Sequence, residues 1–119
     1  MNNEGNWPSG WLKATLATCV LRIVELSGGT YGHEVMALLA EHGLGQIGGG
    51  TLYPLLRRLA EDGLVSTTWV EGEFGPARKV YVVTDAGRRE LVAQAKGWEE
   101  FTRVTNELLI GKGMDNVER

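Results

Sequence analysis

The apolar residues of this chain change their spacing in the middle of the sequence, and that change limits the folds open to it. As far as Gly63 they recur every three or four residues, which predicts helices with one buried side. Residues 65–71 and 79–84 are instead rich in β-branched and aromatic side chains, and the turn-forming segment 72–78 joins them. This pattern predicts a β-hairpin. From residue 85 to about residue 110 the helical spacing returns, which predicts one long helix.

Capping and helix-breaking residues indicate where the first three helices begin and end. The first helix is expected over 11–26, and Thr30 is expected to cap the second. The third helix should cover 51–62. Pro54 is tolerated only near a helix start, which places that start at about residues 48–50.

The order of elements predicts one particular fold. Thr84 follows the hairpin and is expected to cap the long last helix, so the order is helix, helix, helix, hairpin, long helix. Three short helices followed by two strands form a winged helix-turn-helix, whose third helix enters the major groove of DNA. We therefore expect a mainly α (α+β) fold with a two-stranded wing and a long C-terminal dimerisation helix.

The composition is that of a single folded domain. The chain has 119 residues, of which 43% are hydrophobic and 23% charged, which argues against disorder. Cys19 is the only cysteine, so no intramolecular disulfide can form, and a reducing cytoplasm is the expected setting. The amino terminus resembles no signal peptide, and charged residues interrupt every apolar stretch before it could span a bilayer. We expect a cytoplasmic protein without membrane contact.

Four segments are expected along the chain. Residues 1–9 should form a flexible N-terminal arm, and residues 10–84 the winged helix-turn-helix DNA-binding domain. Residues 85–111 should form the C-terminal dimerisation helix, because their stripe is too apolar for a free surface. Residues 112–119 are expected to be a tail.

Positive charge gathers in the middle of the chain although the net charge is −3. For DNA binding, the location of charge matters more than its sum. No acidic residue interrupts 44–60, and arginine can bond guanine or phosphate while hydroxyl groups and wing cations contact the backbone. Tyr53 could instead be partly buried, and His33 could equally be a local cap. The side chains expected to contact DNA are Tyr31, His33, Thr51, Tyr53, Arg57, Arg58, Arg78 and Lys79.

Two runs of residues and one short motif together resemble one protein family. Residues 51–65 (TLYPLLRRLAEDGLV), 75–89 (GPARKVYVVTDAGRR) and 31–34 (YGHE) have the order and spacing seen in the PadR family of bacterial transcriptional regulators. The resemblance covers about residues 12–110 and is to the short form, which ends after a single C-terminal helix. It implies a homodimeric repressor whose third helix and wing contact operator DNA.

The resemblance also implies roles for the first and last helices. The last helix should pack against its copy in the partner subunit, with help from the first. Some short members place a tryptophan at the position of Trp98 in a pore between subunits, where it stacks on flat drug-like molecules. Trp98, with Trp11, is therefore the candidate site for a planar aromatic effector, and packing in the dimer core is the alternative for Trp98. The residues expected at the dimer interface are Leu12, Leu16, Leu91, Ala95, Trp98, Phe101, Thr105 and Leu108.

The chain departs from the family pattern at two places. Residues 47–50 read IGGG, where relatives usually carry a serine or threonine and a proline before the glycine. This difference removes a side-chain cap from the start of the third helix. Val80 stands in the wing where an aromatic residue is common, a change that concerns packing.

An enzyme is not expected. Residues 43–48 match the dinucleotide-binding pattern G-x-G-x-x-G, but that pattern needs a strand before it and a doubly wound sheet around it. Here a helix precedes it and the chain is too short. The two histidines and Cys19 lack the spacing of metal ligands, so neither a metal nor another cofactor is expected.

The main hypothesis from the sequence is a homodimeric repressor bound to a pseudo-palindromic operator. A small-molecule effector would release it by changing the separation of the two recognition helices. The alternative is a winged-helix protein-interaction module without sequence-specific DNA binding, whose association with DNA would be weak and insensitive to salt.

Overall fold

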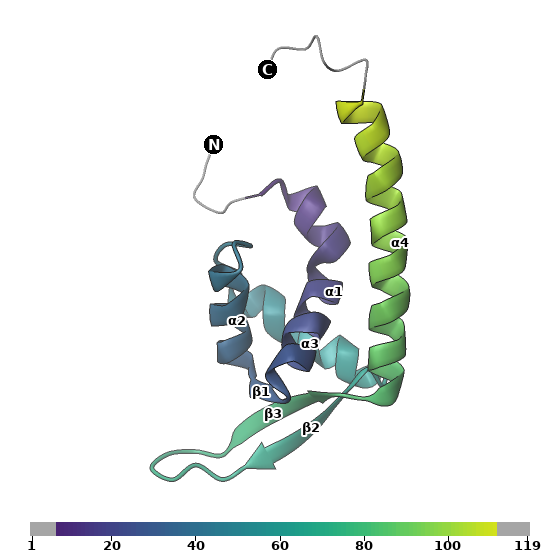
Figure 1. Cartoon of the computed structure of the whole chain (residues 1–119). Helices are drawn as coiled ribbons and strands as arrows, with labels where there is room; N and C mark the ends of the chain where they lie inside the picture. Colours follow the sequence, from purple (N-terminus) through teal and green to yellow (C-terminus); the bar gives the residue numbers. More distant parts are fainter. Residues whose placement is uncertain (1–6, 112–119) are drawn as a thin grey trace.

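The computed structural model describes residues 7–111 and has a mainly helical fold with a small antiparallel sheet (Figure 1). Three helices and two strands lead to the long last helix, as the sequence predicted, and a further two-residue strand precedes the second helix. The elements are α1 (Ser9–Ser27), β1 (Thr30–Tyr31), α2 (Gly32–Glu41), α3 (Gly49–Glu61), β2 (Val65–Val70), β3 (Arg78–Val83) and α4 (Asp85–Ile110).

The sheet has three strands in the order β1-β3-β2, with β3 hydrogen-bonded on both sides. Strands β2 and β3 form the hairpin expected from the sequence, paired from Val65 opposite Val83 to Val70 opposite Arg78. On the other side of β3, Thr30 lies opposite Tyr81. The wing is therefore anchored to the segment that leads into α2.

Strand β1 corrects one sequence expectation. Thr30 does not cap α2, because its backbone belongs to the strand and the helix begins two residues later, at Gly32. Its side chain is buried and donates a hydrogen bond to the carboxylate of Glu34. Capping preferences are local and do not predict this strand pairing, because the partner of Thr30 is Tyr81, far along the chain.

The other helix boundaries agree well with the residues that predicted them. Helix α3 begins at Gly49, inside the predicted window, so that Pro54 is its sixth residue. Thr84 caps α4 by accepting a hydrogen bond from the backbone N–H of Gly87, and its own hydroxyl donates to the carbonyl of Gly63. This second bond ties the start of α4 to the end of α3.

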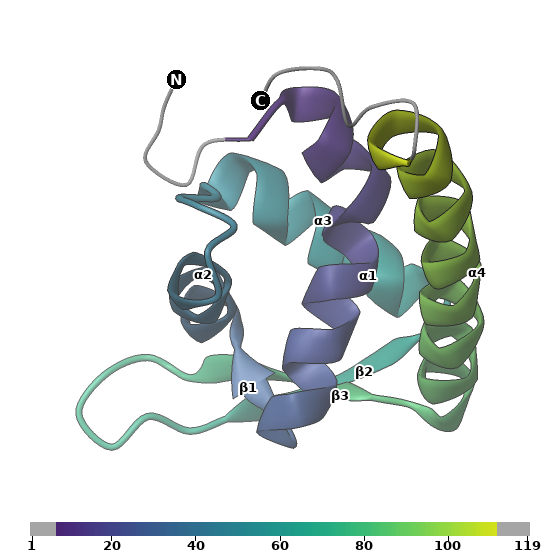
Figure 2. The ribbon, with the colours of Figure 1, turned by 45° about the horizontal axis from the view of Figure 1, so that its top comes forward.

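Helix α1 lies at the centre of the subunit, between α2 and α4 and above the sheet (Figure 2). It contributes more side chains to the core than any other helix, in keeping with this position. The core residues are Leu16, Val20, Leu21, Ile23, Val24, Val35, Leu39, Leu52, Leu56, Leu59, Val65, Tyr81, Val83 and Leu91.

The predicted N-terminal arm, 1–9, lies largely outside the described residues, as does the predicted tail, 112–119. Within the arm, Ser9 already belongs to α1, and the indole of Trp7 donates a hydrogen bond of 2.9 Å to the carbonyl of Gly43. The start of the described chain therefore lies against the end of α2.

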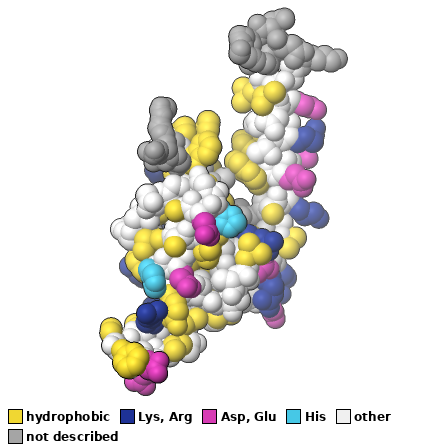
Figure 3. Space-filling model, turned by 60° about the vertical axis from the view of Figure 1, so that its left-hand side comes forward, with side chains coloured by type: hydrophobic (Ala, Val, Ile, Leu, Met, Phe, Trp, Pro, Cys, Tyr) yellow, Lys and Arg dark blue, Asp and Glu magenta, His cyan; other side chains and the backbone are white. Residues whose placement is uncertain are grey.

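Helix α4 packs on the rest of the subunit only near its beginning (Figure 1). Leu91 is its last buried residue, and every later side chain is exposed or half-buried. One edge of the helix carries charges, among them Arg103 paired with Glu100 and Glu107, and hydrophobic side chains lie along the other edge (Figure 3). None of the helices in residues 7–111 combines the length and apolarity needed to cross a membrane.

Candidate nucleic-acid interface

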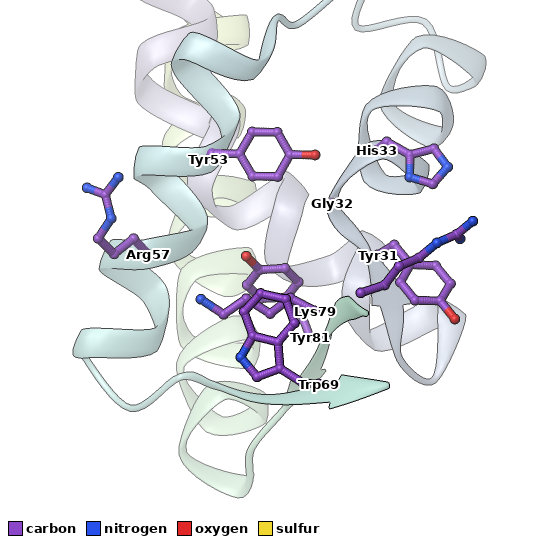
Figure 4. A pocket seen from close by; sticks show the side chains of 9 residues that line it. Tyr31, Gly32, His33, Tyr53, Arg57, Trp69, Lys79 and Tyr81 are labelled. Carbon is purple, nitrogen blue, oxygen red and sulfur yellow. The ribbon is translucent and has the colours of Figure 1, made fainter. Parts of the chain in front are cut away.

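A hollow of about 410 Å³ opens where the start of α2, the exposed side of α3 and the wing meet (Figure 4). Six of the eight side chains predicted to contact DNA line it, although they come from four separate elements, β1, α2, α3 and β3. No acidic side chain is among its lining residues. They are Tyr31, Gly32, His33, Tyr53, Arg57, Trp69, Arg78, Lys79 and Tyr81.

Helix α3 divides its predicted DNA contacts between two edges. Tyr53 and Arg57 are four residues apart, so they lie on the same edge and both line the hollow. Thr51 and Arg58 are seven residues apart and lie together on another edge. They are exposed but do not line the hollow. The exposed surface of α3 therefore offers two rows of polar side chains, one of them facing the wing.

The two cations of the wing point to opposite faces of β3, because successive side chains of a strand alternate. The guanidinium of Arg78 lies 4.8 Å from the ring centre of Tyr31. The ammonium of Lys79 lies 5.8 Å from the ring centre of Trp69 and 5.9 Å from that of Tyr81. Both cations therefore rest on aromatic rings, which hold them at the rim of the hollow.

The positive charges around the hollow are not neutralised by neighbouring carboxylates. Within residues 7–111 the arginines in salt bridges are Arg22, Arg88 and Arg103, all paired along their own helices. Arg57 and Arg78 make no such pair in this part of the chain. An excess of positive charge beside a helix that projects from the surface is the electrostatic footprint of a nucleic-acid site.

The turn at the tip of the wing differs in charge from the strand residues next to it. Phe74 is almost fully exposed at the tip, and the acidic residues Glu71 and Glu73 lie beside it in the sequence. Figure 3 shows these acidic and hydrophobic colours gathered at the end of the wing, away from the helices. The positive charge suited to phosphate lies next to this turn, at Arg78 and Lys79, where the two paired strands end.

Tyr53 holds the start of α2 against α3. Its ring lies so close to Gly32 that a Cβ atom there would overlap it, and a Cβ atom at Gly49 would also lie tightly against it. Tyr53 is 41% exposed, so one side of the ring packs on backbone and the other faces solvent. The sequence left open whether Tyr53 is a surface or a partly buried residue, and the structure places it in both environments.

Three residues of the hollow were not among the predicted site residues. They are Gly32, in the motif 31–34, Trp69, in the strand segment 65–71, and Tyr81, in the run 75–89. Two-residue alternation from Lys79 would have placed Tyr81 on the same face. Burial raises the pKa of the Tyr81 phenol above its usual range, Tyr53 adds to that shift, and the charge of Arg57 opposes it.

A second, larger groove of about 1050 Å³ runs between α1 and α4. Trp98 and Phe101 line it, and their ring centres are 5.8 Å apart. Trp11 does not line this groove; it is exposed near the start of α1, with its ring centre 6.3 Å from that of Trp7. One subunit alone therefore does not bring the two candidate effector-binding tryptophans together.

The predicted dimer residues fall into two groups. Leu16 and Leu91 are 8% and 7% exposed, so they belong to the core of their own subunit and offer no surface to a partner. Both residues are buried, as their apolar spacing predicts, but they pack α1 against α4 within one subunit. Leu12 and Thr105 are half-buried, and the remaining predicted residues, Ala95, Trp98, Phe101 and Leu108, are exposed.

A third helix that projects beside a two-stranded wing, with unneutralised cations on both, defines a winged helix-turn-helix transcriptional regulator. The family follows from comparison with known sequences. The model of the PadR-like transcriptional regulator family matches residues 20–93, and the chain belongs to that family.

Similar proteins agree with this assignment. Transcriptional regulator Rv3488 of Mycobacterium tuberculosis is 42% identical over 65 residues, which cover 55% of this chain and 59% of that protein. A PadR family regulator from Eggerthella lenta has a similar structure, with a TM-score of 0.78 and 34% identity over 85% of this chain and 87% of that one. A PadR-like regulator from Bacillus cereus has a TM-score of 0.76 and 33% identity, over 87% and 99%.

The contact of Tyr53 with Gly32 can be tested by a double-mutant cycle. Gly32→Ala should lower the free energy of unfolding by about 1–3 kcal/mol, because the added methyl group must displace the ring. In a Tyr53→Ala background the same change should cost much less. Urea denaturation measures both values, and Gly50→Ala, in open space on α3, is the control. An equal cost in both backgrounds would mean that Tyr53 is not the obstacle.

Proposed function

We propose that the protein is a homodimeric repressor that binds a pseudo-palindromic operator through α3 and the wing. The observation that carries this proposal is the hollow in which Arg57, Arg78 and Lys79 come together without a carboxylate. Arginine on a helix in the major groove can bond guanine, while the wing cations lie near the phosphates. A repressor acts by occupying its operator, which requires DNA binding and no catalytic group.

The partner that fits the exposed side of α4 is a second copy of the chain. Beyond Leu91 this helix carries a row of large apolar side chains that its own subunit does not cover. A two-fold dimer pairs such a surface with itself. Two recognition helices in one dimer would then read half-sites about 34–36 Å apart, one turn of DNA. The exposed apolar residues are Val92, Trp98, Phe101, Val104, Leu108, Leu109 and Ile110.

The groove between α1 and α4 suits a planar aromatic effector. Its volume is at the upper end of the range for small-molecule sites, about 300–1,000 Å³, and Trp98 and Phe101 offer ring faces for stacking. Because the groove adjoins the proposed dimer surface, a ligand there would change how the subunits are held. It would release DNA only if it binds one spacing of the recognition helices more tightly than the other.

The alternative, a protein-interaction module with the same fold, makes opposite predictions. Such a module would not need unpaired arginines around the hollow, and its association with DNA would be weak and insensitive to salt. Arg57→Ala would then leave DNA binding unchanged. The same variant therefore separates the two functions.

DNA binding should respond differently to changes in the wing and in α3. Arg78→Ala should weaken binding to all duplexes about equally and lower the salt slope by about one, for one lost phosphate contact. Arg57→Ala should also lower the preference for a selected operator by about 1–3 kcal/mol. Fluorescence anisotropy over a salt series measures both effects, with the α4 variant Lys96→Ala as control. A wing variant that alters sequence preference while Arg57→Ala does not would contradict this assignment.

Dimerisation should depend on the exposed part of α4. Leu108 is 79% exposed, so Leu108→Glu should leave the subunit folded while removing about 1.5–3 kcal/mol of apolar burial per chain from the interface. Sedimentation velocity at micromolar concentration should show a shift from dimer to monomer. Lys96→Glu, also an exposed position of α4, should remain dimeric. A wild-type protein that is monomeric at this concentration would remove the proposal.

Effector binding should depend on Trp98. Trp98→Ala should abolish the fluorescence quenching that planar aromatic ligands produce, because it removes a stacking surface from the groove. Trp11→Ala provides the comparison, since it affects binding only if the partner subunit brings Trp11 to the groove. Both variants must first be shown to dimerise. Equal binding of a ligand panel by Trp98→Ala and wild-type protein would leave Trp98 with a packing role only.

A further inference from the structure

Tyr81 is a buried residue whose hydroxyl has no hydrogen-bond partner among residues 7–111. It lies on β3, is 5% exposed and lines the hollow between α3 and the wing. Within residues 7–111 that hydroxyl makes no hydrogen bond to another protein group. Buried polar groups in native proteins nearly always have a partner. A partner for the Tyr81 hydroxyl is therefore expected from outside these residues.

The surroundings of this hydroxyl favour an anion. In Figure 4 the phenol points from β3 toward α3, into the space bordered by Tyr53, Arg57 and Lys79. The ammonium of Lys79 is 5.9 Å from the Tyr81 ring, and Arg57 is close enough to oppose the rise in its pKa. Lys79 and Tyr81 lie on the same face of β3, and Arg57 lines the same hollow, so the hydroxyl donor lies in positive surroundings that suit a group with several negative oxygens.

The start of α2 adds to this preference. No side chain caps the helix at Tyr31, so the first backbone N–H groups beside the hollow are not occupied by a capping oxygen. Free N–H groups at a helix start favour negative charge. The helix is ten residues long, and Gly32 at its first position lines the hollow.

We propose that Tyr81 and Lys79 together bind one phosphate group of the DNA backbone, with the Tyr81 hydroxyl donating to a phosphate oxygen. This inference rests on the proposed DNA-binding function. A phosphate projects from the duplex and can enter a hollow between helix and wing, whereas base edges lie on the floor of the groove. Because Tyr81 and Lys79 belong to β3 and line the hollow beside α3, a phosphate bound there fixes how deeply α3 is inserted.

The direct test is Tyr81→Phe, which removes the hydroxyl and keeps the ring. Affinity for every duplex should fall roughly tenfold, as expected for a lost hydrogen bond to a charged group. The salt slope should not change, because no charge is removed, whereas Lys79→Ala should lower it by about one. The melting temperature should not fall, since the lost hydroxyl makes no hydrogen bond within residues 7–111. Thr68→Val, which removes a hydroxyl from the opposite face of the wing, should bind like the wild type.

Chemical substitution in the DNA identifies the group that is bound. Each phosphate of a selected duplex is replaced in turn by a neutral methylphosphonate. At one position in each half-site the substitution should lower the affinity of the wild-type protein. The affinity of Tyr81→Phe should be the same for this modified duplex as for unmodified DNA. Calorimetric titration with inorganic phosphate distinguishes a free anion from the phosphodiester, and we expect no binding at millimolar concentration.

Three results would overturn this inference while leaving the proposed function intact. The first is wild-type affinity of Tyr81→Phe on a duplex that the wild-type protein binds. The second is a fall in melting temperature that accompanies the loss of affinity, which would make the hydroxyl structural. The third is tight binding of inorganic phosphate with no sensitive position in the methylphosphonate series. Failure of the wild-type protein to bind any duplex would instead overturn the proposed function itself.

Discussion

The hydrogen bonding of β3 on both of its edges is the constraint on which the rest of the structure depends. On one edge β2 completes the wing, and on the other the two residues of β1 connect it to the start of α2. The pairing of Thr30 with Tyr81 therefore places α2, the wing and, through the contact of Gly32 with Tyr53, α3 in one arrangement. Without β1 the wing would be a two-stranded hairpin, which has little stability alone.

The same strand distributes the chemistry of the candidate interface. Because side chains alternate along β3, Lys79, Tyr81 and Val83 lie on the same face of the strand. Tyr81 and Val83 are buried in the core, and Lys79 rests on the rings of Trp69 and Tyr81. Arg78 points to the other face and lies over Tyr31. Core packing and the proposed phosphate contacts thus share one strand, so that the fold itself sets the distance between wing cations and α3.

Helix α4 combines two functions that its sequence does not separate. Its first turns complete the subunit core through Leu91, and its remaining length carries apolar side chains that nothing in the subunit covers. The change from one to the other follows from the groove between α1 and α4, because beyond Leu91 the two helices no longer pack closely against each other (Figure 1). The stability of the subunit and the proposed dimer contact can therefore be altered separately, at Leu91 and at Leu108.

The sequence by itself determined the elements, because their signals are local. Pro54 and the glycines before it located the start of α3, Thr84 located the start of α4, and β-branched residues marked the wing. Most of the candidate interface could also be predicted, since its cations lie on these elements. The tertiary structure alone decided that Thr30 joins a strand, that Leu16 and Leu91 are core residues, and that Tyr81 faces the hollow. Each of these depends on a partner far along the chain, and residue spacing shows which side of an element is apolar but not what covers it.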